Sequence, residues 1–211
     1  MLVSEIISAA KQYTQIDGSV WFSDTEALRS VNRAYRDVYE KILDADNEYF
    51  IKEVDALVSA MTPVRDFTYD YSLPADWHRL RRIAAVLPVG DHVLGRTDPQ
   101  GIGQYEGYRY YQDKLRLMFR APYDTFRIEY YPTPTEYTAL NQSIVYPPQL
   151  EPLILAYQMA IDITNAQNGD TSKHETEYIK LWNRFSHATA RRDNLRYPRV
   201  ANVYRSTFPG W

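Results

Sequence analysis

Four histidines and a few closely spaced carboxylates are the side chains of this chain that could carry catalysis. The histidines are His78, His92, His174 and His187. Two metal ligands on one helix face need a spacing of three or four residues, and no two of these histidines have it. The chain also has no cysteine, which excludes a disulfide, a thiolate metal site and a cysteine nucleophile. We therefore expect no catalytic residue, no metal site and no cofactor.

Two pairs of aspartates, Asp44 with Asp46 and Asp66 with Asp70, could do acid–base work if burial separated their pKa values. Both pairs lie beside polar loop residues, which favours a solvated surface. The stretch GRTDPQGIG follows no strand and precedes no Lys-Ser or Lys-Thr, so it is not a phosphate-binding loop. A small hydrolase that uses the acid pairs is the least favoured of three function classes.

Basic and aromatic side chains gather at the end of the sequence. Residues 1–190 carry 19 basic and 26 acidic side chains, a balance of −7, whereas residues 191–211 carry five arginines and one aspartate, a balance of +4. This asymmetry suggests that the tail docks on an acidic surface. The candidate partner-binding residues are Arg191, Arg192, Arg196, Tyr197, Arg199, Tyr204, Arg205, Phe208 and Trp211.

The four aromatic residues of this tail are spaced too irregularly for one helix face. Burial of four rings does not offset the backbone entropy of ordering some twenty residues, so the tail needs further contacts. A partner surface supplies them when it offers a sheet edge and carboxylates for the arginines. We therefore predict an extended docking arm at residues 193–211. The alternative is a frayed terminus without a role.

The tyrosine-rich run from Tyr105 to Tyr111 is the second place where binding chemistry could reside. Rings interleaved with an arginine can stack on single-stranded nucleic acid. However, Glu106 and Asp113 bracket the run, and alternating tyrosines are typical of a half-buried sheet. A single-strand-binding module that uses this run and the tail remains the runner-up. The acidic body argues against a general DNA-binding surface, since Lys and Arg supply nonspecific affinity.

Helical signals lie at both ends of the chain. We predict a helix at 4–13 capped by Ser4, and a long helix from the capping box SDTE at 23–26 to about residue 47. Two more helices follow YPPQLEP and NGD, the last capped by Thr171 and ending near Arg192. The apolar face of the first of these two comprises Leu150, Leu153, Ile154, Tyr157, Ala160, Ile161 and Thr164. No stretch approaches the ~20 apolar residues that span a bilayer, so we expect a soluble protein.

The middle of the chain has the period of strands. FTYDYSLP, RLRRIAAVLPV, the pair in YRYYQDKLRLMF around a turn at 112–114, and FRIEYYP predict an antiparallel meander. The Gly- and Pro-rich stretch at 90–103 predicts an exposed loop, whereas residues 48–60 fit either helix or strand. The chain is long enough for one domain plus an extension. The predicted fold is α+β: a bundle of about four helices at 1–47 and 147–192, an inserted small antiparallel β-sheet at about 48–132, and the extended C-terminal arm.

The order of these signals resembles the head-to-tail adaptor (head completion) proteins of tailed double-stranded DNA bacteriophages. The marks are Trp21 before a capped helix with the Asn-x-Ala-Tyr core at 32–35, the Leu-Pro-x-Asp turn at 73–76, Tyr-Tyr-Pro at 130–132 and the proline-started helix. The resemblance covers roughly residues 1–190. It does not include a matched motif in the tail.

The resemblance implies a structural virion protein without catalysis, made in the host cytoplasm and located in the virion neck. Residues 1–192 would be the adaptor domain. Such proteins form a ring, usually of twelve copies, beneath the portal, extend the DNA channel and offer a platform to a downstream tail or neck protein. A C-terminal arm of this kind embraces the portal or a neighbouring copy. Double-stranded DNA would pass without specific binding, which suits an acidic body.

Overall fold

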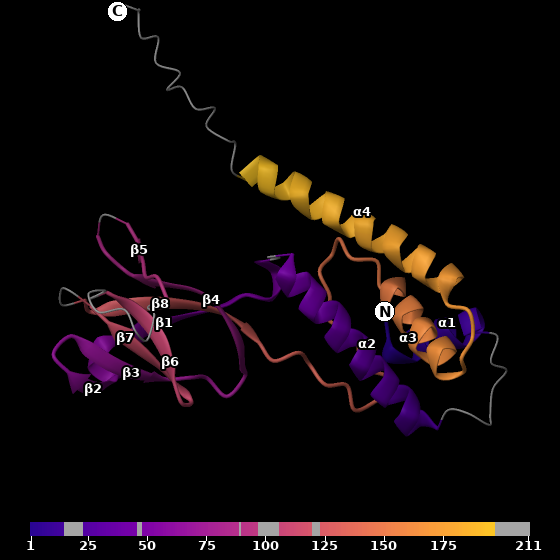
Figure 1. The fold of residues 1–211 in the computed structure, drawn as a ribbon, viewed down its shortest axis with the longest axis horizontal. Coiled ribbons are helices and arrows are strands. Elements are labelled where there is room, and N and C mark those ends of the chain that lie inside the picture. The colour runs from indigo at the N-terminus through magenta and orange to yellow at the C-terminus, as the bar shows by residue number, and fades with distance from the viewer. Residues whose placement is uncertain (15–22, 46–47, 89, 97–105, 120–122, 197–211) are drawn as a thin grey trace, which may run out of the picture. The chain divides into compact units, whose positions relative to one another are not determined.

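The structure is a computed structural model that describes residues 1–14, 23–45, 48–88, 90–96, 106–119 and 123–196. The chain divides into two compact units. A helical unit comprises residues 1–47 and the chain from residue 134 onward, and a β unit comprises residues 48–133. The predicted α+β class, with β structure inserted into a set of four helices, is confirmed (Figure 1).

The long helix α2, Asp24–Asp44, begins where the sequence predicts. The Ser23 hydroxyl oxygen accepts the backbone N–H of Glu26 (3.3 Å), and the Glu26 carboxylate accepts the backbone N–H of Ser23 (3.0 Å). Hydrogen bonds from Ser23 lower the pKa of the Glu26 carboxyl. The apolar stripe of α2 is buried in the helical unit: Ala27, Val31, Ala34, Tyr35, Val38, Tyr39, Ile42 and Leu43.

Helix α1, Val3–Thr14, is one residue longer at each end than predicted, and Ser4 does not cap it. The backbone N–H groups of Val3 and Ser4 donate to the carbonyl oxygens of Gln142 and Leu140, both at 3.0 Å. A segment more than a hundred residues away therefore satisfies the free amides of the first turn. Inspection of the sequence identifies only caps formed by residues nearby in the chain, which is why it predicts Ser4 as the cap of α1.

The segment that returns from the β unit to the helical unit is tied to α2. The Asn32 side chain donates from Nδ2 to the Tyr137 carbonyl oxygen (2.9 Å) and accepts the Tyr137 backbone N–H at Oδ1 (2.8 Å). The Tyr35 hydroxyl donates to the Val145 carbonyl oxygen, and the Val145 N–H donates to the Tyr137 hydroxyl, both at 2.9 Å. The rings of Tyr35 and Tyr137 meet edge to face at 5.1 Å. Asn32 and Tyr35 thus fasten the returning chain.

Helix α3, Leu153–Ala166, contacts the other three helices, α1, α2 and α4 (Ser172–Arg196). The predicted apolar face of α3 is partly wrong, because Leu153, Tyr157 and Ile161 are only half-buried. The buried residues are Ile154, Leu155, Ala156, Met159, Ala160 and Ile163. A helix covered on several sides has no single apolar stripe, which is why the stripe rule fails here.

The predicted β region is confirmed, but it forms two four-stranded antiparallel sheets instead of one meander. The first sheet has the order β1 (Lys52–Leu57), β8 (Thr125–Pro132), β4 (Trp77–Ala85) and β5 (His92–Val93). Residues 48–60, open between helix and strand, contain β1 between the short 3₁₀ turns Glu48–Phe50 and Val58–Ala60. The predicted loop at 90–103 contains β5, and part of it lies outside the described residues.

The second sheet has the order β2 (Thr62–Arg65), β3 (Thr68–Ser72), β7 (Lys114–Met118) and β6 (Gly107–Tyr111). The predicted tight turn between β6 and β7 is present, and Gln112 adopts φ +56° in it.

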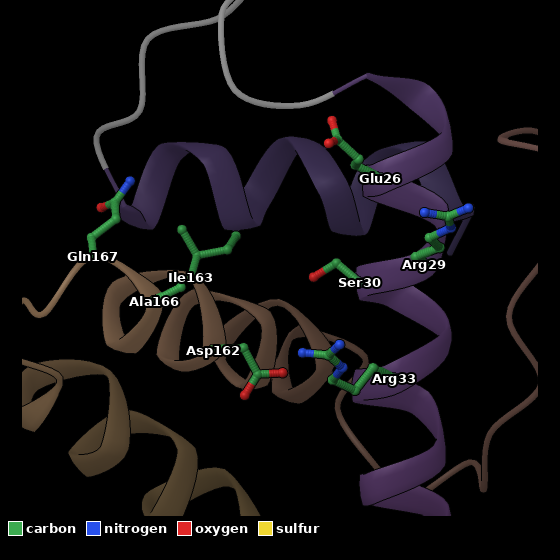
Figure 2. Close-up of a pocket in the computed structure, with 8 residues that line it drawn as sticks. All are labelled: Glu26, Arg29, Ser30, Arg33, Asp162, Ile163, Ala166 and Gln167. Atoms are coloured by element: carbon green, nitrogen blue, oxygen red, sulfur yellow. The ribbon is translucent and has the colours of Figure 1, made fainter.

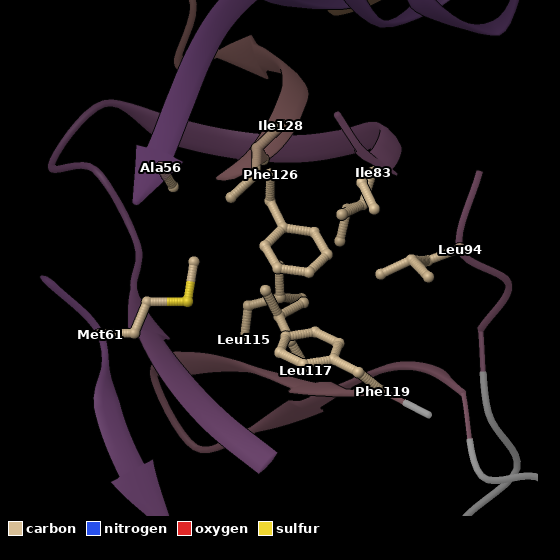
Figure 3. Packing of buried hydrophobic residues seen from close by; sticks show 10 residues of the cluster. Ala56, Met61, Ile83, Leu94, Leu115, Leu117, Phe119, Phe126 and Ile128 are labelled. Atoms are coloured by element: carbon tan, nitrogen blue, oxygen red, sulfur yellow. The ribbon is translucent and has the colours of Figure 1, made fainter. Parts of the chain in front are cut away.

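Residues of both sheets pack into one hydrophobic core in the β unit (Figure 3). Phe126 and Ile128 of β8 come from the first sheet, and Leu115 and Leu117 of β7 from the second. The rings of Phe119 and Phe126 stack at 4.5 Å. Alternate residues of β7 and β8 therefore point into a shared interior, while the intervening charged residues point outward.

Asn32→Ala should destabilise the protein, because it removes two hydrogen bonds and leaves the N–H and carbonyl of Tyr137 without this partner. We expect a loss of about 2 kcal/mol in the free energy of unfolding, measured by urea denaturation. The control is Arg36→Ala on the exposed side of α2, which should stay within about 0.5 kcal/mol of the parent. Equal stability of the two variants would contradict the fastening role of Asn32.

Candidate assembly surfaces

The nine residues predicted to bind a partner fall into two groups. Arg191, Arg192 and Arg196 lie in the last turns of α4, which ends at Arg196 and not near Arg192. The prediction that the extended segment starts at residue 193 is therefore wrong by four residues. The other six residues lie outside the described part of the chain: Tyr197, Arg199, Tyr204, Arg205, Phe208 and Trp211.

Helix α4 is fixed to the helical unit over its first half. The Asp170 carboxylate accepts the backbone N–H of Ser172 (2.9 Å), and hydrogen bonds from Ser172 lower the pKa of Asp170. Thr171, the predicted cap, precedes the first helical residue, and its hydroxyl donates to the Glu175 carboxylate (2.6 Å). The buried side of α4 includes Tyr178, Leu181 and Phe185. The chain that follows α4 thus leaves from an anchored helix.

The carboxylate pairs considered for hydrolysis do not form an acid–base site. Both oxygens of Asp70 bind Arg116, with Nε to Oδ1 at 2.7 Å and Nη2 to Oδ2 at 2.9 Å. These hydrogen bonds lower the pKa of Asp70, so this carboxyl stays ionised and is no proton donor. Asp44 lies in the last turn of α2, and Asp46 is outside the described residues. Asp66 is exposed in the β2–β3 turn.

The four histidines lie on three different elements. His78 lies in β4, His92 in β5, and His174 and His187 lie thirteen positions apart in α4. Among the described residues, no group of three His, Cys, Asp or Glu side chains could hold a metal ion. His174 is buried, which the sequence did not indicate.

The tyrosine run considered for nucleic acid is mostly used by the second sheet. Tyr108 packs against the β-unit core, and the guanidinium of Arg116 lies 4.0 Å over the ring of Tyr111. Tyr110 is partly exposed and meets Trp77 edge to face at 6.5 Å. Tyr105 lies outside the described residues. The sheet interpretation accounts for these rings without a ligand.

A buried carboxylate on the first sheet binds two consecutive arginines, which sequence inspection missed. A register shift between Leu80 and Arg82 in the pairing of β4 with β8 marks a β-bulge, which lets neighbouring residues share a face. Arg81 Nη1 lies 2.6 Å from Glu129 Oε2, and Arg82 Nε donates to Oε1 at 2.9 Å. Arg81 also binds Glu48 Oε1 at 3.1 Å. Strict alternation would have put the two arginines on opposite faces.

A third arginine on this sheet, Arg127, has several acidic partners. Arg127 Nε lies 2.7 Å from Glu53 Oε1 and 3.2 Å from Asp55 Oδ1, and Nη1 lies 3.4 Å from Asp91 Oδ2. The hydrogen bond with Asp55 and the surrounding negative charges raise the pKa of Arg127. Arg81, Arg82 and Arg127 of the first sheet are therefore all paired with carboxylates.

A hollow of about 330 Å³ lies between α2 and α3. Figure 2 shows Asp162 of α3 and Arg33 of α2 projecting toward the same space. Asp162 Oδ1 accepts Gln158 Nε2 (3.2 Å), whereas the buried Oδ2 has no hydrogen-bond partner among the described residues. Burial raises the pKa of the Asp162 carboxyl. Inspection of the sequence could not identify this buried carboxylate, because its burial depends on the contact between the two helices.

Comparison with known proteins gives one family. The model of the SU10 adaptor protein family matches residues 1–203. A search of curated proteins finds no match. Within the described residues, no helix is both long and apolar enough to cross a membrane.

Glu129→Ala should destabilise the β unit by about 3 kcal/mol, because two arginines lose the carboxylate that neutralises them. Thermal unfolding followed by near-ultraviolet circular dichroism measures the effect. Glu53→Ala, on the exposed edge strand β1, is the matched control and should change stability by less than about 1 kcal/mol. If Glu129→Ala lost no more stability than Glu53→Ala, the ion pairs of Glu129 with Arg81 and Arg82 would not be needed for stability.

Asp162→Asn should raise the free energy of unfolding at pH 7. Since burial raises the pKa of Asp162, the native state retains this proton more strongly than the unfolded chain. Stability from the protonated form is complete below the ordinary carboxyl pKa and is lost as pH rises through the raised pKa. The difference in urea midpoint between variant and parent should therefore grow in favour of the variant as pH rises from 3 to 7. Asp66→Asn is the exposed control, and a less stable Asp162→Asn at pH 7 would refute the prediction.

Proposed function

The chain belongs to the SU10 adaptor protein family, and from that premise we propose that its copies form a ring beneath the portal of a tailed double-stranded DNA phage. The family gives the protein a structural role in the phage virion. In the neck between head and tail, the ring extends the DNA channel and provides a platform for a downstream tail or neck protein. The family match over residues 1–203 is the observation that carries this proposal.

The charge distribution supports a passive channel. The body of the chain is acidic by seven charges, and the arginines of the β unit are used internally, for example Arg81, Arg82 and Arg116. Surfaces that hold DNA depend on free cations that neutralise phosphates. A ring of twelve such copies would let DNA slide past without specific binding.

The C-terminal segment supplies the docking contacts in this proposal. The segment begins at the end of the anchored helix α4 with Arg191, Arg192 and Arg196, and it continues with the aromatic and basic residues after Arg196. Side chains of this kind gain free energy when aromatic rings are buried and arginines meet carboxylates bidentately. The partner is the portal ring or a neighbouring copy, and its contacts would offset the backbone entropy that docking costs.

Truncation after Arg196 should leave a folded protein that no longer attaches to portal rings. The four helices and both sheets are retained, so thermal unfolding by circular dichroism should be unchanged. Electron micrographs of the protein mixed with purified portal should show stacked rings for the full chain and bare portals for the truncated chain.

The matched control is the full chain with Arg33→Ala and Arg36→Ala, which removes two exposed cations from α2 and keeps the arm. This variant should still form stacked rings. Stacking by the truncated chain would remove the arm from the mechanism, and absence of stacking by the full chain would refute the adaptor ring itself.

A further inference from the structure

The turn between β2 and β3 holds an aromatic residue in a backbone conformation that suits glycine or asparagine. Phe67 has φ +54°, a backbone conformation that is strained for a bulky residue. The N–H of Phe119 donates to the Phe67 carbonyl oxygen at 2.9 Å, so the turn is fixed against the end of β7. The Phe67 side chain is 44% exposed. Burial of the ring within the described chain therefore does not explain why this position holds a phenylalanine.

Two hollows meet at Phe67 and Tyr69. One has a volume of about 310 Å³ and is bounded by Leu57, Phe119 and Tyr123, among others. The other has a volume of about 500 Å³ and lies against Pro63 and Val64 of β2. Both volumes fall in the range of roughly 300 to 1,000 Å³ that is typical of binding pockets.

The borders of both hollows are apolar and acidic. Leu57 is 55% exposed and Val64 is 44% exposed, so large apolar side chains face solvent beside Phe67. Asp124 borders the first hollow and Asp66 the second, and both are exposed. Neither carboxylate has a hydrogen bond or ion pair with the described residues. Arg65, the cation at the second hollow, donates from Nε to the Thr68 hydroxyl (3.3 Å). This surface suits a partner with aromatic rings and arginines.

We propose that residues 197–211 of a second copy of this chain occupy the two hollows around Phe67. This segment carries four aromatic side chains, two arginines and no acid, which complements the exposed apolar side chains and two carboxylates that lack an ion pair with the described residues. Aromatic side chains would enter the hollows, and Arg199 and Arg205 would meet Asp66 and Asp124. Fifteen extended residues reach about 50 Å beyond Arg196, enough to cross to a neighbouring subunit.

We choose a second copy as the occupant because the proposed function is a ring of copies, and this inference rests on that function. When a segment of one copy binds a different surface of the next, the contact is heterologous, and repeated contacts of this type form a ring when the rotation between subunits closes. The same contact within one chain would occupy both surfaces and connect no subunits. The proposal therefore assigns the arm to the contact between subunits.

Binding of a labelled synthetic peptide of residues 197–211 tests the surface directly. The receptor is the full-length chain with Phe208→Ala and Trp211→Ala, so that its own arm does not compete. We expect saturable binding by fluorescence anisotropy, weakened about tenfold or more when Phe67→Asn is added. Asparagine tolerates positive φ, so the turn is kept, and circular dichroism verifies the fold. Val93→Asn, an equally exposed apolar site on β5, is the matched control and should leave the affinity unchanged.

Mixing two full-length variants distinguishes a second copy from the same chain. Phe67→Asn keeps the arm but lacks the aromatic anchor, and the Phe208→Ala, Trp211→Ala chain keeps the anchor but lacks the arm. We expect each alone to stay monomeric and the mixture to form a one-to-one complex by light scattering. No complex, or equal peptide affinity for Phe67→Asn and Val93→Asn receptors, would overturn the proposal.

Attachment to portal rings separates this inference from the proposed function. If the peptide assay fails while the full chain still stacks on portal, the adaptor role stands and the Phe67 surface is wrong. If the peptide binds at Phe67 while the full chain does not stack on portal, the docking surface stands and the adaptor role is wrong.

Discussion

The pairing of Asn32 with the backbone of Tyr137 is the contact that closes the helical unit around its insertion. The chain leaves this unit after α2, forms the whole β unit and then returns. On its return, the side-chain amide of Asn32 makes two hydrogen bonds with the Tyr137 backbone, as a neighbouring strand would. Tyr35 then fastens Val145, and the carbonyl oxygens of Leu140 and Gln142 cap α1. One asparagine therefore aligns the return segment, which completes α1 and leads into α3, the helix that contacts the other three.

Features that depend on neighbours in the sequence were predictable, and features that depend on distant contacts were not. The Ser23 capping box, the β6–β7 turn and the inserted β region follow from local chemistry and strand periodicity. The cap of α1, the buried sides of α3 and the shared face of Arg81 and Arg82 depend on residues far away in the chain. Phe67 was assigned to a strand by alternation, although it is a turn residue. Composition alone selected the nine candidate binding residues. Only the structure shows that Arg191, Arg192 and Arg196 lie in a helix.

The β unit keeps its apolar and charged surfaces separate in a way that suits repeated assembly. Its core lies between the sheets. Four of its arginines, Arg81, Arg82, Arg116 and Arg127, are neutralised by Glu129, Asp70 and the acids around Arg127. Paired charges keep the sheet surfaces solvated and discourage random association. The exposed apolar side chains around Phe67 differ from these paired surfaces.

The discontinuous helical unit also fixes an order of events during synthesis. Helices α1 and α2 emerge long before α3, the partner that buries them, whereas the β unit is continuous and is complete before α3 appears. At about 5 to 20 residues per second, the ribosome needs roughly 5 to 20 s to travel from Asp44 to Leu153. Throughout that interval the apolar stripe of α2 lacks its cover. The helical unit can form only after translation has passed α3, so aggregation of the unfinished chain is most dangerous in that window.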